Sequence, residues 1–157
     1  MKEDDFIVSK TDLKGRITYG NDIFIKMSGY SEKELLNAPH SILRHRDMPK
    51  IVFHLLWDRI KNKKPINAYV KNLTKNGDFY WVFANVTASL DNSGNIIGYY
   101  SVRRKPSKKG VDAVEGLYSE LLAVEKSQGL EASGKVLENK LIEMGVNYDE
   151  LVISLQK

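Results

Sequence analysis

Hydrophobic positions in the middle of the chain follow a helical period. Between residues 50 and 62 the apolar side chains, taken at about 100° per residue, cover an arc of roughly 240°. This arc is wider than the stripe of an ordinary surface helix, so we expect a helix that is buried on two sides. Asp47 is a plausible N-cap and Pro49 suits the first turn. One side can pack on a sheet, and the other, with Phe53 and Trp57, faces the core or a ligand cavity.

From residue 66 the hydrophobic period changes to two, which is typical of strands. Lys75-Asn76-Gly77-Asp78 is a strong hairpin signal between two such runs, and residues 91–95 form another turn. A third turn, at residues 11–15, separates two short runs near the start of the chain. We therefore expect strands at residues 6–9, 16–19, 66–73, 79–90 and 96–104.

Two short helices are expected between the second and the third strand. Asn21 can cap a helix that ends at Gly29, and Ser31 with Glu34 three residues later is the pattern of a capping box. Together with the longer helix and the strands, this order predicts an α+β domain. Its sheet is antiparallel with about five strands, and short helices lie on one face.

Pro106 and Ser107 break the strand pattern, and helical spacing returns after them. We place one domain at residues 1–106 and a helical C-terminal extension at residues 107–157. The expected helices of the extension are residues 111–127, 133–144 and 148–155. Because an isolated amphipathic helix is marginal in water, these helices must bury their apolar stripes on the domain, on a second copy of the chain or on a partner.

Composition narrows the possible chemistry. The 157 residues include no cysteine, which excludes disulfides, thiolate metal sites and thiol nucleophiles. No run of about 18 apolar residues occurs and the N-terminus does not resemble a signal peptide, so we expect a soluble, cytoplasmic protein without direct membrane insertion. The net charge is +4, from 24 Lys and Arg against 20 Asp and Glu. We interpret the basic residues, including the cluster at residues 103–109, as a solvated surface and not as a nucleic-acid site.

No catalytic constellation is present in the sequence. The chain has no nucleophile–base motif, no Walker loop and no GxGxxG. The three histidines lack metal-ligand spacing. We therefore predict neither catalytic residues nor metal ligands, and we do not expect an enzyme.

Four stretches together resemble PAS sensor domains: residues 11–24, 28–35, 39–49 and 70–86. The first two are general PAS motifs. The third reads Pro-His-Ser-Ile-Leu-Arg-His-Arg-Asp-Met-Pro, and the fourth contains Lys-Asn-Leu-Thr-Lys-Asn-Gly-Asp-Phe-Tyr-Trp. Both resemble the FAD-binding PAS sensors of the aerotaxis receptor (Aer) family. The chain departs from that family at Ile66, because the family commonly has Trp after the preceding proline.

The resemblance implies a PAS fold and a cytoplasmic redox or energy sensor of bacterial chemotaxis (aerotaxis), with FAD bound between the sheet and the helix at residues 50–62. As a free-standing chain it also resembles CetB of the CetA–CetB energy-taxis systems. That likeness implies a chemoreceptor-type membrane signalling protein as partner, which would recruit the chain to the inner face of the membrane. A homodimer is a further expectation. The alternatives are a PAS sensor of haem or another small ligand, and a ligand-free protein-interaction module.

Several side chains of the implied FAD site could have either of two roles. Asn72 can both donate and accept, as the pyrimidine edge of a flavin requires, but it could instead satisfy a backbone group. Trp57 could stack on a ring system or simply pack in the core. Arg44 and His45 could neutralise a diphosphate, or belong to a salt-bridged surface loop. The full set of expected cofactor-binding residues is Asn21, Arg44, His45, Asp47, Phe53, Trp57 and Asn72.

Small residues could leave room for the flavin ring. Ala68 belongs to the same face of its strand as Asn72, and Ala84 and Ala88 share one face of the next strand. Asn21 is expected to cap a helix first and to contact the cofactor only in addition. Asp47 could order its loop or meet a ribose hydroxyl.

Overall fold

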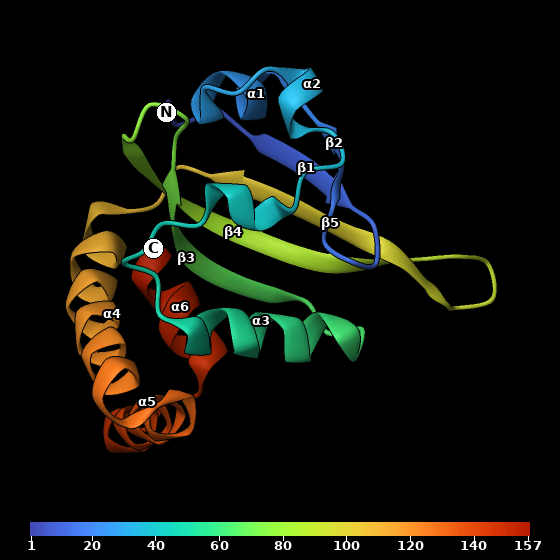
Figure 1. Cartoon of the computed structure of the whole chain (residues 1–157). Coiled ribbons are helices and arrows are strands. Elements are labelled where there is room, and N and C mark those ends of the chain that lie inside the picture. The colour runs from blue at the N-terminus through green and yellow to red at the C-terminus, as the bar shows by residue number, and fades with distance from the viewer.

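The computed structural model describes all 157 residues and is built around one antiparallel sheet of five strands (Figure 1). The strands are β1 (Ile7–Thr11), β2 (Ile17–Gly20), β3 (Ile66–Leu73), β4 (Phe79–Leu90) and β5 (Ile96–Arg104). Their spatial order is β2-β1-β5-β4-β3, so β1 pairs with β5 in the middle of the sheet. Each expected strand is present, and the α+β prediction is confirmed.

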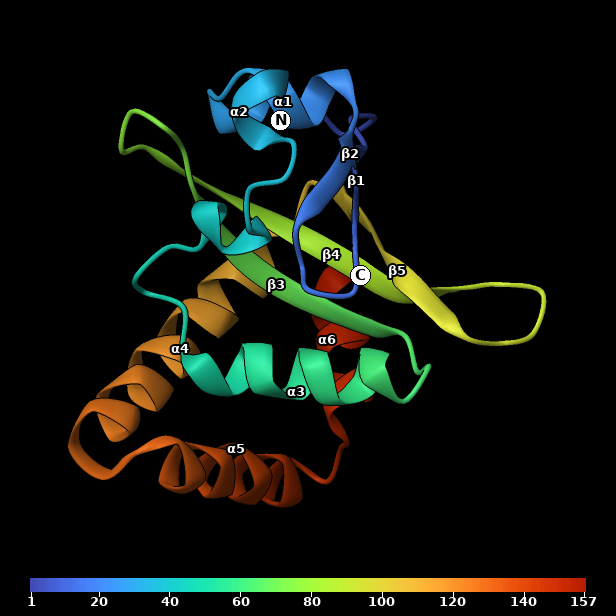
Figure 2. The same ribbon diagram turned by 45° about the vertical axis from the view of Figure 1, so that its right-hand side comes forward.

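Four helical segments between β2 and β3 lie on one face of the sheet, which we call the inner face (Figure 2). They are α1 (Asp22–Ser28), α2 (Glu32–Leu35), the 3₁₀ helix η1 (His40–Leu43) and α3 (Lys50–Lys61). The Asn21 side chain caps α1, and Ser31 with Glu34 forms the expected capping box on α2. The 3₁₀ helix was not expected from the sequence.

The C-terminal extension forms three helices that cover the outer face of the sheet. They are α4 (Lys108–Gln128), α5 (Leu130–Met144) and α6 (Tyr148–Gln156). The Tyr118 hydroxyl donates to the Tyr69 carbonyl at 2.7 Å, and the Tyr148 hydroxyl donates to the Asn67 carbonyl at 2.8 Å. Of the three ways to bury the extension, the structure therefore uses packing on the chain's own domain. None of the helices is long and apolar enough to cross a membrane.

Helix α3 lies between two cores. On one side Ile60 belongs to a core formed with the sheet and the first helices, and on the other Ile51 and Val52 pack with the C-terminal helices. The prediction of a helix buried on two sides is confirmed. The extension, in addition to the sheet, supplies the packing on the second side.

The start of α3 differs from the expectation. Asp47 is not the N-cap, because α3 begins after Pro49 and the Asp47 carboxylate pairs with the Lys71 ammonium at 2.9 Å. The free backbone amides are satisfied from the extension instead. Glu125 of α4 accepts hydrogen bonds from the amides of Lys50 at 2.8 Å and Ile51 at 3.0 Å.

Candidate functional site

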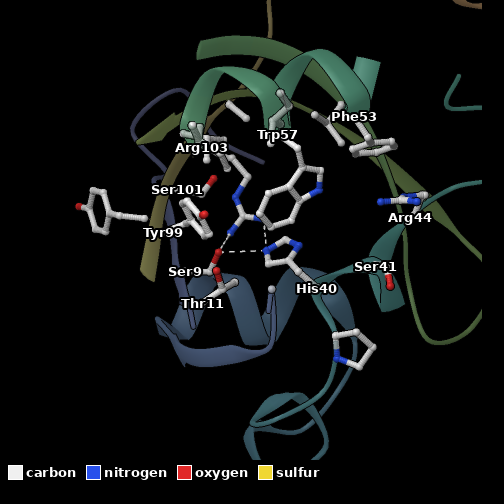
Figure 3. A pocket seen from close by; sticks show the side chains of 18 of the residues that line it. Ser9, Thr11, His40, Ser41, Arg44, Phe53, Trp57, Tyr99, Ser101 and Arg103 are labelled. Carbon is white, nitrogen blue, oxygen red and sulfur yellow. Dashed lines mark hydrogen bonds between the residues drawn. The ribbon is translucent and has the colours of Figure 1, made fainter. Parts of the chain in front are cut away.

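A cavity of about 270 Å³ lies between the inner face of the sheet and α3 (Figure 3). Residues of β1, η1, α3, β3, β4 and β5 line it, so segments that are far apart in the sequence meet in its wall. Its lining includes Ser9, His40, Arg44, Phe53, Trp57, Val70, Asn72, Ala84, Tyr99 and Arg103.

The apolar walls of the cavity come from α3 and the central strands. Phe53 and Trp57 line it from α3, and Val70 and Ala84 line it from the sheet. The Trp57 ring meets the Tyr99 ring edge-on, with centroids 5.2 Å apart, and this contact holds the indole in place. A flat apolar group can therefore lie between aromatic and small side chains.

A buried polar cluster closes one end of the cavity (Figure 3). Arg103 of β5 is 3% exposed and donates to the Ser9 hydroxyl, and a second guanidinium nitrogen lies 3.4 Å from His40 Nε2. Ser9 and His40 are also in hydrogen-bond contact at 3.1 Å. No carboxylate pairs with Arg103, and its Nε has no hydrogen-bond partner.

Burial and charge set the protonation of this cluster. Burial, with a smaller effect of the nearby Arg103 charge, lowers the pKa of His40 to about 3, so the imidazole is neutral at physiological pH. Burial also lowers the pKa of Arg103 to about 10, which leaves the guanidinium charged. A buried cation with only neutral partners is costly, so this end of the cavity suits a ligand atom that carries negative charge or accepts hydrogen bonds.

Asn72 presents a second unpaired donor to the cavity. Its side chain is 4% exposed on β3, and Nδ2 has no hydrogen-bond partner. Buried amides are nearly always paired in folded proteins, so this one fits a polar ligand edge. The alternative that Asn72 satisfies a backbone group through Nδ2 does not hold in this structure.

The seven expected site residues separate into three groups. Arg44, Phe53, Trp57 and Asn72 line the cavity. His45 and Asp47 lie in the adjacent loop. Asn21 lies outside, because its amide is used by the backbone of Phe24, Val8 and Phe6.

The loop residues have partners of their own. His45 Nδ1 accepts from the Asp47 amide at 3.0 Å, and burial is the main cause that lowers the pKa of His45. The hydrogen bond from Lys71 is the main cause that holds the pKa of Asp47 below its usual value. These contacts tie Asp47 to its own loop and to β3, which fits the expected role of ordering the loop.

Several lining residues were missed from the sequence. Arg103 was assigned to a solvated basic cluster, and this was wrong because its side chain is buried on the inner face. The alternation of Tyr99, Ser101 and Arg103 along β5 could have placed it. Of the three small residues expected beside a ring, Ala84 lines the cavity, and Ile66 lies in the core and not in the cavity wall.

Comparisons with known proteins agree with this architecture. A family model described as the PAS fold matches residues 17–103. The aerotaxis receptor of Escherichia coli K12 is 42% identical over 78% of this chain, and the nitrogen fixation regulatory protein of Klebsiella pneumoniae is 28% identical over 62%. The chain spans only 24% and 20% of these relatives, respectively.

Solved structures share the fold at low sequence identity. A light-oxygen-voltage domain studied with a flavin analogue matches with a TM-score of 0.61 and 21% identity, over 69% of this chain and 82% of that one. The light state of the Aureochrome1 LOV photoreceptor matches with a TM-score of 0.60 and 22% identity, over 81% and 94%. These likenesses concern the fold alone. With the family match over more than half of its length, the chain belongs to the PAS fold family.

Proposed function

We propose that this PAS domain binds FAD non-covalently in the cavity between the sheet and α3 and acts as a redox or energy sensor for aerotaxis. The observation that carries the proposal is the pair of buried, unpaired donors in that cavity, Asn72 Nδ2 and Arg103 Nε. A flavin ring offers acceptor atoms at its edge and flat faces for Trp57 and Ala84. The resemblance to FAD-binding PAS sensors supports this ligand, and the likeness in sequence to the aerotaxis receptor supports the role in aerotaxis.

The residues present fit the different parts of a flavin. Bound FAD would supply a redox centre that becomes more electron-rich on reduction. Arg103 stays charged and has no carboxylate partner, so it would stabilise the reduced ring more than the oxidised one. His40 stays neutral and adds no competing charge. The Asn72 amide can donate or accept by rotating, so its orientation would depend on the redox state.

The same strand connects this amide to the extension. Lys71, next to Asn72, pairs with Asp47 on the outer side, and the Tyr69 carbonyl accepts from Tyr118 of α4. A change at Asn72 would therefore alter contacts that hold the C-terminal helices.

The partner surface follows from the packing. The extension covers the part of the outer face that bears Trp81 and Phe83, so this part of the sheet is not free to meet a partner. We propose that the C-terminal helices meet a chemoreceptor-type membrane protein that recruits the chain to the membrane. A homodimer would use the same helices.

Titration of the purified protein with FAD, followed by flavin fluorescence, tests the binding step. We expect saturable one-to-one binding. Asn72→Asp keeps the shape but removes the amide donor, and Trp57→Phe shrinks the aromatic wall, so each should weaken FAD binding by about tenfold. Trp57→Phe should unfold near the wild-type temperature, since it leaves no large cavity, whereas Asn72→Asp should unfold at a lower temperature because it buries a carboxyl group. Circular dichroism should show the wild-type fold for both variants at the temperature of the titration.

A matched control lies on the exposed side of the same helix. His54 of α3 is exposed and lines no cavity described here, so His54→Ala should bind FAD like the wild type. Absence of FAD binding, or identical affinity in all variants, would contradict the proposal. A haem-binding PAS domain would instead bind haem and ignore FAD.

A further inference from the structure

A second hollow, of about 810 Å³, lies between the loop before α3 and the junction of α4 with α5. We call it the basic groove, defined by Arg44, His45, Arg46, Met48, Lys50, Leu73, Gly77, Leu122, Glu125, Lys126, Gly129 and Leu130. Arg44 lines both this groove and the cavity between the sheet and α3, which we now call the flavin cavity. The two spaces therefore adjoin at one side chain. Its guanidinium lies over the Phe53 ring, 4.0 Å from the centroid, at the boundary.

The cations of the basic groove have no acidic partners within the chain. Arg44, Arg46, Lys50 and Lys126 form no ion pair. Elsewhere in the molecule, most of the ion pairs join a lysine or arginine nitrogen to a carboxylate oxygen at 2.6–3.1 Å. Four unneutralised cations around one hollow attract an anionic group.

Glu125 is the only acidic residue in the groove, and its carboxylate is already occupied. It accepts from the backbone amides of Lys50 and Ile51 and from the Ser133 hydroxyl at 3.1 Å. It therefore fixes α4 and α5 against the start of α3. It forms no ion pair with Lys126, and one carboxylate among four cations leaves the groove with a net positive charge.

Apolar side chains alternate with the cations along the groove. Met48 and Leu73 line it from the domain, and Leu122 and Leu130 line it from the extension. A ligand that combines a flat apolar base with phosphates would match this mixture. The flavin cavity, at about 270 Å³, is smaller than the roughly 300–1,000 Å³ of typical ligand sites, so it suits only the ring part of a dinucleotide.

We propose that the basic groove holds the diphosphate–adenosine end of FAD, and that Lys126 is a ligand-binding residue supplied by the C-terminal extension. The inference rests on the proposed function and adds to it that the helical extension is part of the cofactor site. Arg44 contacts the ligand between the two spaces.

Binding of FAD, FMN and riboflavin to the full chain at low ionic strength tests the inference. The wild type should bind FAD at least about tenfold more tightly than riboflavin, with FMN between them. Lys126→Glu should weaken FAD binding by about tenfold and leave the affinity for riboflavin within about twofold of the wild-type value. Higher salt should narrow the difference in affinity between FAD and riboflavin, because the proposed contacts of the diphosphate with the groove are ionic.

Lys109→Glu is the matched control, since Lys109 is exposed near the other end of α4 and forms no ion pair. It makes the same charge change and should bind all three flavins like the wild type. Equal affinity for FAD and riboflavin would overturn the inference while the flavin proposal survives. If Lys126→Glu binds FAD with wild-type affinity, the proposed role of the extension is wrong. If the wild type binds neither riboflavin nor FAD, both proposals are wrong.

Discussion

The two faces of the sheet each bury one cation, and they treat it differently. On the outer face, Lys71 pairs with Asp47 at 2.9 Å and lies over the Phe79 ring at 4.3 Å. On the inner face, Arg103 contacts only neutral groups and keeps one donor unpaired. The outer face is thus complete within the chain, whereas the inner face has buried polar groups that the chain itself leaves unpaired. This difference separates the scaffold from the site.

Replacing Arg103 or Lys71 by methionine should change the free energy of unfolding in opposite directions. Arg103→Met removes a buried charge that has no counter-ion, so the ligand-free protein should gain about 1–3 kcal/mol in the free energy of unfolding. Lys71→Met leaves Asp47 without its partner and should lose about 1–2 kcal/mol. Urea denaturation without flavin measures both. A loss of stability in Arg103→Met would remove the contrast between the two faces.

Two glycines of α4 test how tightly the outer face is packed. A Cβ at Gly110 would clash with the Tyr69 ring, whereas a Cβ at Gly116 would meet nothing within 4 Å. Gly110→Ala should cost about 1–3 kcal/mol through overpacking, and Gly116→Ala should add up to about 1 kcal/mol through helix propensity. Thermal unfolding compares them. Equal gains in both variants would mean that the extension is loosely attached.

The inner face should make stability depend on pH through His40. The pKa of His40 in the folded chain is about 3, against an ordinary 6.5, so between these values only the unfolded chain takes up this proton. Stability contributed by this group is fully present above pH 6.5 and falls as the pH drops, by up to about 1.4 kcal/mol per pH unit. His40→Gln should flatten this slope relative to the wild type. His54→Gln, on the exposed side of α3, should keep it; a similar slope in all three proteins would contradict the assignment.

The smallest effect concerns the contact that joins the extension to α3. Glu125→Ala removes the group that accepts from the Lys50 and Ile51 amides, and should cost about 1 kcal/mol. Hydrogen exchange at these two amides should quicken. Glu115→Ala, an exposed position on the same helix, should leave their exchange unchanged. Unchanged exchange in Glu125→Ala would show that another group caps α3.

Local patterns predicted most of the fold. Alternation along β3 placed Val70 and Asn72 on one face, and this face lines the cavity. The Ser31–Glu34 spacing predicted a capping box that the structure contains. These features depend on residues a few positions apart, which a sequence shows directly.

Long-range contacts could not be predicted in the same way. The cap of α3 comes from Glu125, 75 residues after Lys50, so Asp47 was the better candidate from local spacing alone. Burial of Arg103 depends on its strand lying in the middle of the sheet, whereas the sequence shows a basic run. The sequence also could not predict where the extension packs, because an amphipathic pattern shows which face of a helix is apolar but not which surface that face covers.

The absorption spectrum of the purified chain, followed by identification of any pigment released on denaturation, tests the central claim most directly. The account predicts the bands of a bound oxidised flavin after purification or reconstitution, their bleaching on reduction, and FAD as the released pigment. A haem Soret band, or a colourless protein that takes up no FAD, would contradict it.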